Sequence, residues 1–281
     1  MIAIFALLPC AFAAHPVDRS AEAAPDATVS LENTCGSLSV AAWDKPLLQV
    51  SGNLEEDDDV LVLTGSGARL HLEVKDSHGG DTGCAALLVR LPAGVRLEAE
   101  TVSATLEVAG LTGTLDLDTV SGNLRLQGTP GAATLESVSG EIEIRGAASS
   151  LDLETVSGNI TVGKALGRLD AETVSGDLTI EGGPFDRIEL STVSGDVLLS
   201  GPLTPSGRAE ISAHSGDVTL RPLHGLPATY DLSTFSGDVI GAPSSLRIKD
   251  FTGNRVRWTE GTGTATVEVE THSGDINIEA Q

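Results

Sequence analysis

The amino-acid sequence predicts an all-β protein: a parallel β-solenoid (β-helix) of about ten rungs of 18–21 residues, with an N-terminal β-rich capping region. Two observations carry this prediction. A short motif recurs at nearly constant spacing, and apolar and polar residues alternate on both sides of it. The composition agrees, because the 281 residues include 32 glycines but only two tryptophans, one tyrosine and five phenylalanines. Such a composition is typical of many short strands and turns.

The chain is strongly acidic. It has 17 lysines and arginines against 40 aspartates and glutamates, and its formal net charge is -23. Nucleic acids and anionic membrane surfaces would be repelled by this charge. We therefore expect neither of them as a partner.

Residues 1–14 (MIAIFALLPCAFAA) form an apolar run that ends in small residues. The run is shorter than the roughly 20 residues that a helix needs to cross a bilayer. Ala11-Phe12-Ala13 fits the small-x-small pattern of signal peptidase. We expect a signal peptide at 1–14 and export to the periplasm or cell surface, without a transmembrane segment in the mature chain. Lipoprotein processing at Cys10 is the alternative.

The next two segments precede the repeats. Residues 15–28 have no periodicity and are expected to be a flexible lead-in. Residues 29–94 are expected to form a β-rich cap, since the end of a solenoid otherwise exposes an unpaired strand edge. The expected strands are 38–42, 47–50, 60–64, 70–74 and 86–91. In an exported chain, Cys35 and Cys84 are expected to form a disulfide, with two separate buried thiols as the alternative.

Residues 95–281 contain the repeats. The motif Thr-Val-Ser-Gly, followed by Asp or Asn, has its serine at 121, 139, 157, 175 and 194, where the copy at 139 reads Ser-Val-Ser-Gly-Glu, with looser copies at 215, 236 and 273. Thr-Val-Ser-Ala at 101–104 opens the series, and Thr252-Gly253-Asn254 is counted as a degenerate copy. Repeats of this length indicate stacked units, each of which buries its apolar face against its neighbours.

One copy shows how each rung is built. In LDLETVSGNITV, Leu151 and Leu153 alternate with acidic residues, and Ile160 and Val162 alternate with polar ones. Such alternation predicts half-buried strands. The two apolar pairs are out of phase, so a corner is expected near 155–156. Three internal ladders are predicted: leucines at 115, 135, 151 and 169 in one row or its neighbour, a row through 124, 142, 160 and 178, and a valine row at 102, 120, 138, 156, 174 and 193. Phe235 and Phe251 align with the valine row and are expected in the core.

The motif's glycine and acidic residues are explained by the turn. The repeat-turn glycines are Gly122, Gly140, Gly158, Gly176, Gly195, Gly216, Gly237 and Gly274. They indicate a positive φ or close packing, and the neighbouring Asp or Asn can hydrogen-bond the turn. The competing hypothesis is calcium binding by Asp177, Asp196, Asp217 and Asp238, stacked about 5 Å apart. The glycine-rich nonapeptide of calcium-loaded β-rolls is absent, so no cofactor is expected.

Two copies contain the residue types of a catalytic triad, His214-Ser215 with Asp217 and His272-Ser273 with Asp275. Adjacent residues on a strand point to opposite faces, which is poor spacing for a triad. Other copies carry valine or phenylalanine where the histidine stands. We therefore interpret this as a ladder position and expect no enzymatic activity.

Three features in order resemble a known family. Ala42-Trp43-Asp44-Lys45-Pro46 is followed by Val50-Ser51-Gly52, and Val89-Arg90-Leu91-Pro92-Ala93-Gly94 leads into the Thr-Val-Ser-Gly-Asp series. Over residues 29–281 the chain resembles the bacterial family of β-strand-repeat proteins labelled putative adhesins, a domain of unknown function. The resemblance implies an exported envelope protein with a β-solenoid fold. It carries over no catalytic residues.

These observations favour an exported, non-enzymatic adhesin or envelope structural module, whose partner is an envelope or cell-surface component, either protein or glycan. A calcium-dependent surface or matrix protein is the alternative. A β-helix enzyme acting on acidic polysaccharide would need a basic or calcium-bearing cleft, and the arginines at 125, 145, 168 and 187 and Lys164 do not cluster in the sequence.

Overall fold

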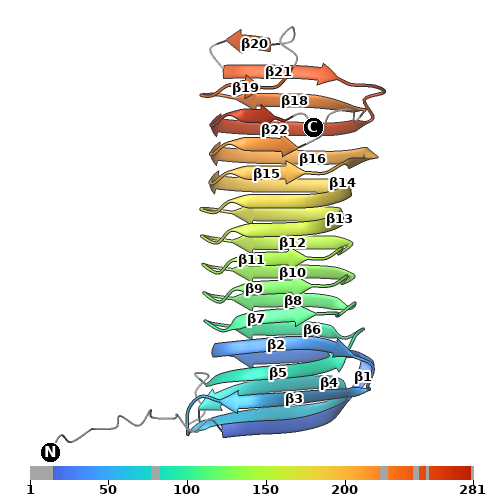
Figure 1. Ribbon diagram of the computed structural model, residues 1–281, viewed down its shortest axis with the longest axis vertical. Coiled ribbons are helices and arrows are strands. Elements are labelled where there is room, and N and C mark those ends of the chain that lie inside the picture. The colour runs from blue at the N-terminus through green and yellow to red at the C-terminus, as the bar shows by residue number, and fades with distance from the viewer. Residues whose placement is uncertain (1–14, 77–82, 222–226, 243–246, 251–252, 280–281) are drawn as a thin grey trace, which may run out of the picture.

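The computed structural model describes residues 15–76, 83–221, 227–242, 247–250 and 253–279. The predicted all-β class is confirmed, because every regular element in these ranges is a strand. The strands stack along one long axis (Figure 1). In the part of the chain that is described, no helix is long and apolar enough to cross a membrane. The expected signal peptide and Phe251 lie outside the described residues.

The strands fall into three regions. The N-terminal region contains β1 (His15–Asn33), β2 (Cys35–Trp43), β3 (Leu47–Leu54), β4 (Asp59–Asp76) and β5 (Cys84–Pro92). The regular repeats contain β6 (Arg96–Thr101), β7 (Thr105–Ala109), β8 (Thr114–Thr119), β9 (Leu124–Gln127), β10 (Ala132–Ser137), β11 (Ile142–Arg145), β12 (Ser150–Thr155), β13 (Ile160–Thr173), β14 (Leu178–Ser194), β15 (Val197–Ser200), β16 (Leu203–Ser215) and β17 (Val218–Arg221). The C-terminal region contains β18 (Ala228–Thr234), β19 (Val239–Ile240), β20 (Arg247–Asp250), β21 (Gly253–Thr259), β22 (Ala265–Ser273) and β23 (Ile276–Ile278).

Equivalent strands of successive repeats pair in parallel and in register. On one face Leu97, Leu115, Ala133, Leu151 and Leu169 are aligned partners. On the other face the aligned partners are Leu106, Leu124, Ile142, Ile160 and Leu178. These side chains are at most 3 % exposed. The core is therefore a set of aliphatic ladders between two strand-lined faces, as the alternation predicted.

Both ends of the stack depart from the order of the sequence. The end of β1, from Thr28, lies between β4 and β6, and β2 lies between β5 and β7. At the other end β22 lies between β16 and β18, and β23 lies between β17 and β19. Figure 1 shows the same arrangement, with β2 above β5 and β22 below β18. One rung at each end is thus inserted between two rungs that are made by other parts of the chain.

Several sequence-based expectations about the ends are wrong. Residues 15–28 are not a flexible lead-in, because β1 starts at His15 and pairs antiparallel with β3 from His15 to Glu22. Residues 60–64 and 70–74 belong to the single strand β4. Of the expected copy at 252–254, Thr252 lies outside the described residues. Gly253 and Asn254 do not form a further parallel copy, because β21 runs antiparallel to β18. In each case pairing with a distant strand supplies the backbone partners that the local sequence does not reveal.

The predicted burial of the valine row is also wrong. Val102, Val120, Val138, Val156, Val174 and Val193 are 46–49 % exposed, and Phe235 is 56 % exposed. The residue before each valine, such as Thr155, is the one that faces inward and is 5 % exposed. The corner leaves two consecutive residues outside, Val156 and Ser157, before Gly158 turns inward again. The predicted corner therefore exists, but the valine lies on its outer side.

Candidate interaction groove

The repeat-turn glycines lie where successive corners touch. At all eight positions a Cβ atom would lie only 1.7–2.1 Å from a carbonyl oxygen of the neighbouring rung. At Gly158, for example, that oxygen belongs to Gly140. None of the eight has a positive φ. Of the two explanations that the sequence left open, the structure therefore supports close packing at the corner.

A row of buried hydroxyl residues supports the same corners, and the sequence analysis missed it. Thr101, Thr119, Ser137, Thr155 and Thr173 are 5–6 % exposed. Thr155 Oγ1 accepts a hydrogen bond from the Gly158 N–H at 3.0 Å, and Ser137 Oγ accepts one from Gly140 N–H at 2.7 Å. Burial of a hydroxyl is tolerated because its hydrogen bond is made. The signal in the sequence was the Thr or Ser that stands three residues before seven of the eight repeat-turn glycines, with Ala213 before Gly216 as the exception.

The aspartates proposed as calcium ligands connect neighbouring rungs. Asp177 Oδ1 accepts a hydrogen bond from the Asp196 N–H, and Asp196 Oδ1 accepts one from the Asp217 N–H, both at 2.9 Å. Asp217 and Asp238 are not neighbours, because Asp275 lies between them and bonds to both at 2.8 Å. These backbone bonds account for an Asp or Asn at this position without a metal.

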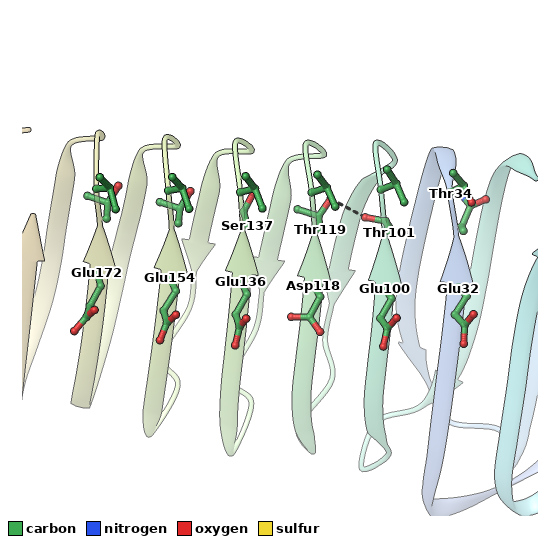
Figure 2. Close-up of a pocket in the computed structure, with 18 of the residues that line it drawn as sticks. Glu32, Thr34, Glu100, Thr101, Asp118, Thr119, Glu136, Ser137, Glu154 and Glu172 are labelled. Carbon is green, nitrogen blue, oxygen red and sulfur yellow. Dashed lines mark hydrogen bonds between the residues drawn. The ribbon is translucent and has the colours of Figure 1, made fainter. Parts of the chain in front are cut away.

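A groove runs beside the corners, along the outer side of the stack (Figure 2). We call it the valine–carboxylate groove. Its volume is about 920 Å³. One side carries a carboxylate row, Glu73, Glu32, Glu100, Asp118, Glu136, Glu154 and Glu172, and the other carries the exposed valines from 102 to 193. The buried hydroxyl row lies between them in the sequence of each strand. At 4.8 Å per rung, the groove is about 34 Å long.

At the N-terminal end of the groove Glu73 pairs with Lys75, and both Glu73 and Glu32 lie near His71. The carboxylates of the next five rungs lack cationic partners in the described part of the chain, with one exception. Two aligned rows on five successive rungs contain Glu98, Glu100, Asp116, Asp118, Glu136, Asp152, Glu154, Asp170 and Glu172. Among the described residues, only Glu98 of this set has an ion pair, with Arg96 at 3.1 Å. Like charges one rung apart repel by about 0.9 kcal/mol even in water. This part of the face is therefore a strongly negative surface.

The crowding perturbs individual groups. Burial, followed by repulsion from Asp116, Glu136 and Glu100, raises the pKa of Asp118 to about 6. Burial also raises the pKa of Asp170, with repulsion from neighbouring carboxylates as a further cause. Asp170 Oδ1 is buried without a hydrogen-bond partner. Such uncompensated charge would be relieved by a bound cationic group.

Higher in the stack the same face is neutralised. Arg187 lies 2.9 Å from Glu189 and 3.4 Å from Glu210. Arg208 pairs with Glu210 and Glu268, and Arg255 pairs with Asp231 at 2.6 Å. Most carboxylates of these upper rungs are therefore paired, in contrast to those beside the groove, although Glu270 on β22 has no ion pair among the described residues.

The triad-like residues lie in the continuation of the valine row. The His214 and His272 rings stack with centroids 5.0 Å apart, and Phe235 stacks on His272 at 4.9 Å. Asp217 and Asp275 take part in the backbone bonds described above. This arrangement agrees with a ladder position that accepts valine, phenylalanine or histidine.

The two cysteines lie opposite each other on β2 and β5. Their Cα atoms are 4.6 Å apart, and Cys35 and Cys84 are joined by a disulfide. The bond connects the inserted rung at the N-terminal end to the rung below it. It lies outside the set of residues that line the groove.

Comparisons with solved structures give low similarity. A putative adhesin from Parabacteroides distasonis is 12 % identical, with 95 % of this chain and 98 % of that chain covered and a TM-score of 0.47. A putative adhesin from Bacteroides fragilis is 14 % identical, with 94 % of this chain and 97 % of that chain covered and a TM-score of 0.43. A putative lipid binding protein from P. distasonis is 10 % identical, with 94 % of this chain and 97 % of that chain covered and a TM-score of 0.38.

The remaining comparisons concern the sequence itself. Among curated proteins, none matches this chain. A family profile, described as Toastrack DUF4097, matches residues 48–279, which include nearly all of the repeats. The chain therefore belongs to the Toastrack DUF4097 family.

Proposed function

We propose that this protein is an exported, non-enzymatic β-solenoid that acts as an interaction module of the cell envelope, either as an adhesin or as a structural component. Its binding surface is the valine–carboxylate groove. The observation that carries the proposal is the combination of exposed valines and unpaired carboxylates at matching positions on successive rungs. Export is supported by the leader-like residues 1–14 and by the disulfide, which is typical of an oxidising compartment.

The groove fits an extended partner segment that alternates basic and apolar side chains. Valines repeat at the rung spacing on one side, and carboxylates repeat at the same spacing on the other. Same-side side chains of an extended segment repeat about every 6.8 Å, against about 4.8 Å per rung. Such a partner can therefore bury apolar atoms and neutralise charge at several rungs of the groove, though not at every one. The occupant we propose is a basic segment of an envelope protein, since an anionic glycan or lipid headgroup would be repelled.

The proposal can be tested with a labelled decapeptide of alternating lysine and valine, whose binding is followed by fluorescence anisotropy. Simultaneous replacement Asp118→Asn, Glu136→Gln and Glu154→Gln should weaken binding by about tenfold or more. The matched control, Glu189→Gln, Glu210→Gln and Glu268→Gln, removes the same number of charges from the same face outside the groove. It should weaken binding by no more than about twofold.

The apolar side of the groove needs a separate variant. Val138→Ser with Val156→Ser should leave folding unchanged, because both side chains are about half exposed. It should weaken binding by about 30-fold, because each of the two valines loses about 1 kcal/mol of apolar burial. If the groove variant and the control variant bind the peptide equally well, the groove is not the binding surface. The same conclusion follows if the two serine substitutions leave peptide binding unchanged.

A calcium-dependent surface or matrix protein is the second candidate, and the unpaired carboxylates favour it. Calcium prefers oxygen ligands, which the two aligned acidic rows supply. Thermal unfolding with millimolar calcium and with chelator separates the two candidates. A large rise in the midpoint with calcium would favour the second candidate, whereas the basic-segment proposal expects the same midpoint in both solutions.

A further inference from the structure

A cluster of three metal-ligating side chains lies at the N-terminal end of the groove. His71 and Glu73 are two residues apart on β4 and so face the same side of the sheet. Glu32 on β1 is the aligned partner of Glu73, and Ser30 is the aligned partner of His71. The cluster therefore spans two strands that are distant in the sequence, which is why the spacing of the histidines did not reveal it.

The ligand atoms are close to one another. One nitrogen of His71 and one carboxylate oxygen from each of Glu32 and Glu73 all lie within 4.8 Å of each other. The His71 Nε2 to Glu73 Oε2 distance is 3.3 Å. Two ligands of a tetrahedral zinc ion, each about 2.0–2.1 Å from the metal, are about 3.4 Å apart. The existing His71–Glu73 separation thus already suits a shared ion.

The surroundings hold the ligands in place. Glu73 is 7 % exposed, and Lys75 Nζ lies 2.9 Å from its Oε1. Glu73 Oε2 faces the histidine. On the opposite edge of the ring, His71 Nδ1 lies 3.3 Å from Ser30 Oγ and 3.8 Å from Glu32 Oε1. The contact with Ser30 is of the kind that orients metal-bound histidines.

We propose that Glu32, His71 and Glu73 bind one divalent transition-metal ion of the zinc type. An imidazole nitrogen with two carboxylates suits zinc and its neighbours in the series, whereas calcium prefers oxygen ligands alone. The side chains of His71 and Glu32 are 37 % and 40 % exposed, so an ion can enter and retain a water ligand. The ion would connect β1 to β4. This site is independent of the basic-segment proposal, because it needs no macromolecular partner.

The test is equilibrium dialysis of the purified protein against zinc chloride, together with the absorption spectrum of the cobalt-loaded protein. We expect one ion per chain and an absorption band of low-coordinate cobalt. His71→Gln should abolish both. Glu32→Gln, at an exposed position that does not endanger folding, should weaken zinc binding by at least about tenfold.

Two matched controls separate this site from diffuse attraction to the acidic face. Glu154→Gln makes the same chemical change in the same carboxylate row, several rungs away, and should leave the zinc affinity unchanged. His214→Gln removes an exposed histidine of the stacked column and should do the same. Absence of saturable binding, full binding by His71→Gln, or loss of binding in either control would overturn the proposal.

Discussion

Replacement of a single corner glycine should destabilise the whole stack. In Gly158→Ala the new Cβ would lie 1.9 Å from the Gly140 carbonyl oxygen, so the two corners must separate by about 1 Å or more to reach ordinary contact. The hydrogen bond from Ser157 N–H to Val138 O, and that from Ile142 N–H to Asn159 O, are 3.0 Å long. Such a displacement would take both beyond hydrogen-bonding range.

The magnitude follows from these losses. Loss of the two hydrogen bonds lowers the free energy of unfolding by about 2 kcal/mol, and overpacking lowers it by about 2 kcal/mol more. Alanine offsets about 0.7 kcal/mol of this loss, because it has less conformational entropy than glycine in the unfolded chain. The net loss is about 3 kcal/mol, which corresponds to a fall of about 6–12 °C in the melting temperature for a chain of this size. Circular dichroism during thermal unfolding measures it.

A matched substitution in the same rung provides the control. At Gly163 the nearest atom to a new Cβ is Ile144 O at 3.8 Å, an ordinary contact, and φ is not positive. Gly163→Ala should therefore be neutral or stabilising by less than about 1 kcal/mol. If Gly158→Ala melts at the same temperature as Gly163→Ala, close packing of the corners does not explain the glycine row.

The remaining predictions concern charge and covalent support. Because the folded-state pKa of Asp118 is about 6, above its ordinary 3.8, its charged form destabilises the fold. The folded state therefore favours the protonated side chain. This contribution to the free energy of unfolding is complete below pH 4 and is lost as the pH rises through 6 and the group ionises. Asp118→Asn should thus gain about 1 kcal/mol at pH 7, after allowance for solvent screening, and nothing at pH 4, as measured by denaturant unfolding at both values. Reduction of the Cys35–Cys84 disulfide, which spans 49 residues, should cost about 4 kcal/mol, and dithiothreitol should have no effect on the doubly serine-substituted variant. Asp196→Asn keeps the acceptor for the Asp217 N–H and should stay within about 0.5 kcal/mol of the parent in urea titrations, whereas Asp196→Ala should lose about 1 kcal/mol; equal losses would contradict the backbone-bonding role.

The repeat itself made most of the fold predictable. Copies 18 residues apart pair residue for residue, so the row through Leu124, Ile142 and Ile160 follows directly from the repeat spacing. The valine row was assigned to the wrong side because alternation alone does not reveal how many residues a corner leaves outside. Thr155 is buried in place of Val156 because its hydroxyl is bonded to the Gly158 N–H. Polarity therefore did not decide burial at this position.

Other features depend on pairing between distant segments. The unpaired carboxylates were visible as an acidic row, but their lack of partners depends on where each arginine lies around the stack. Arg187 neutralises Glu210 from the neighbouring rung, and no local pattern predicts that contact. The cluster of Glu32, His71 and Glu73 similarly requires β1 to lie against β4. Sequence spacing could not bring these three residues together.

The inserted rungs determine how the protein responds to mechanical load. A force on β23, the last described strand, acts on a strand bonded to β17 on one side and β19 on the other. At the opposite end, Thr28–Asn33 of β1 is held between β4 and β6. A strand at the outer edge could be peeled away one hydrogen bond at a time, whereas a strand with two neighbours yields only when both ladders shear together. Tension that reaches β23 or Thr28–Asn33 therefore meets the shearing resistance of two parallel ladders.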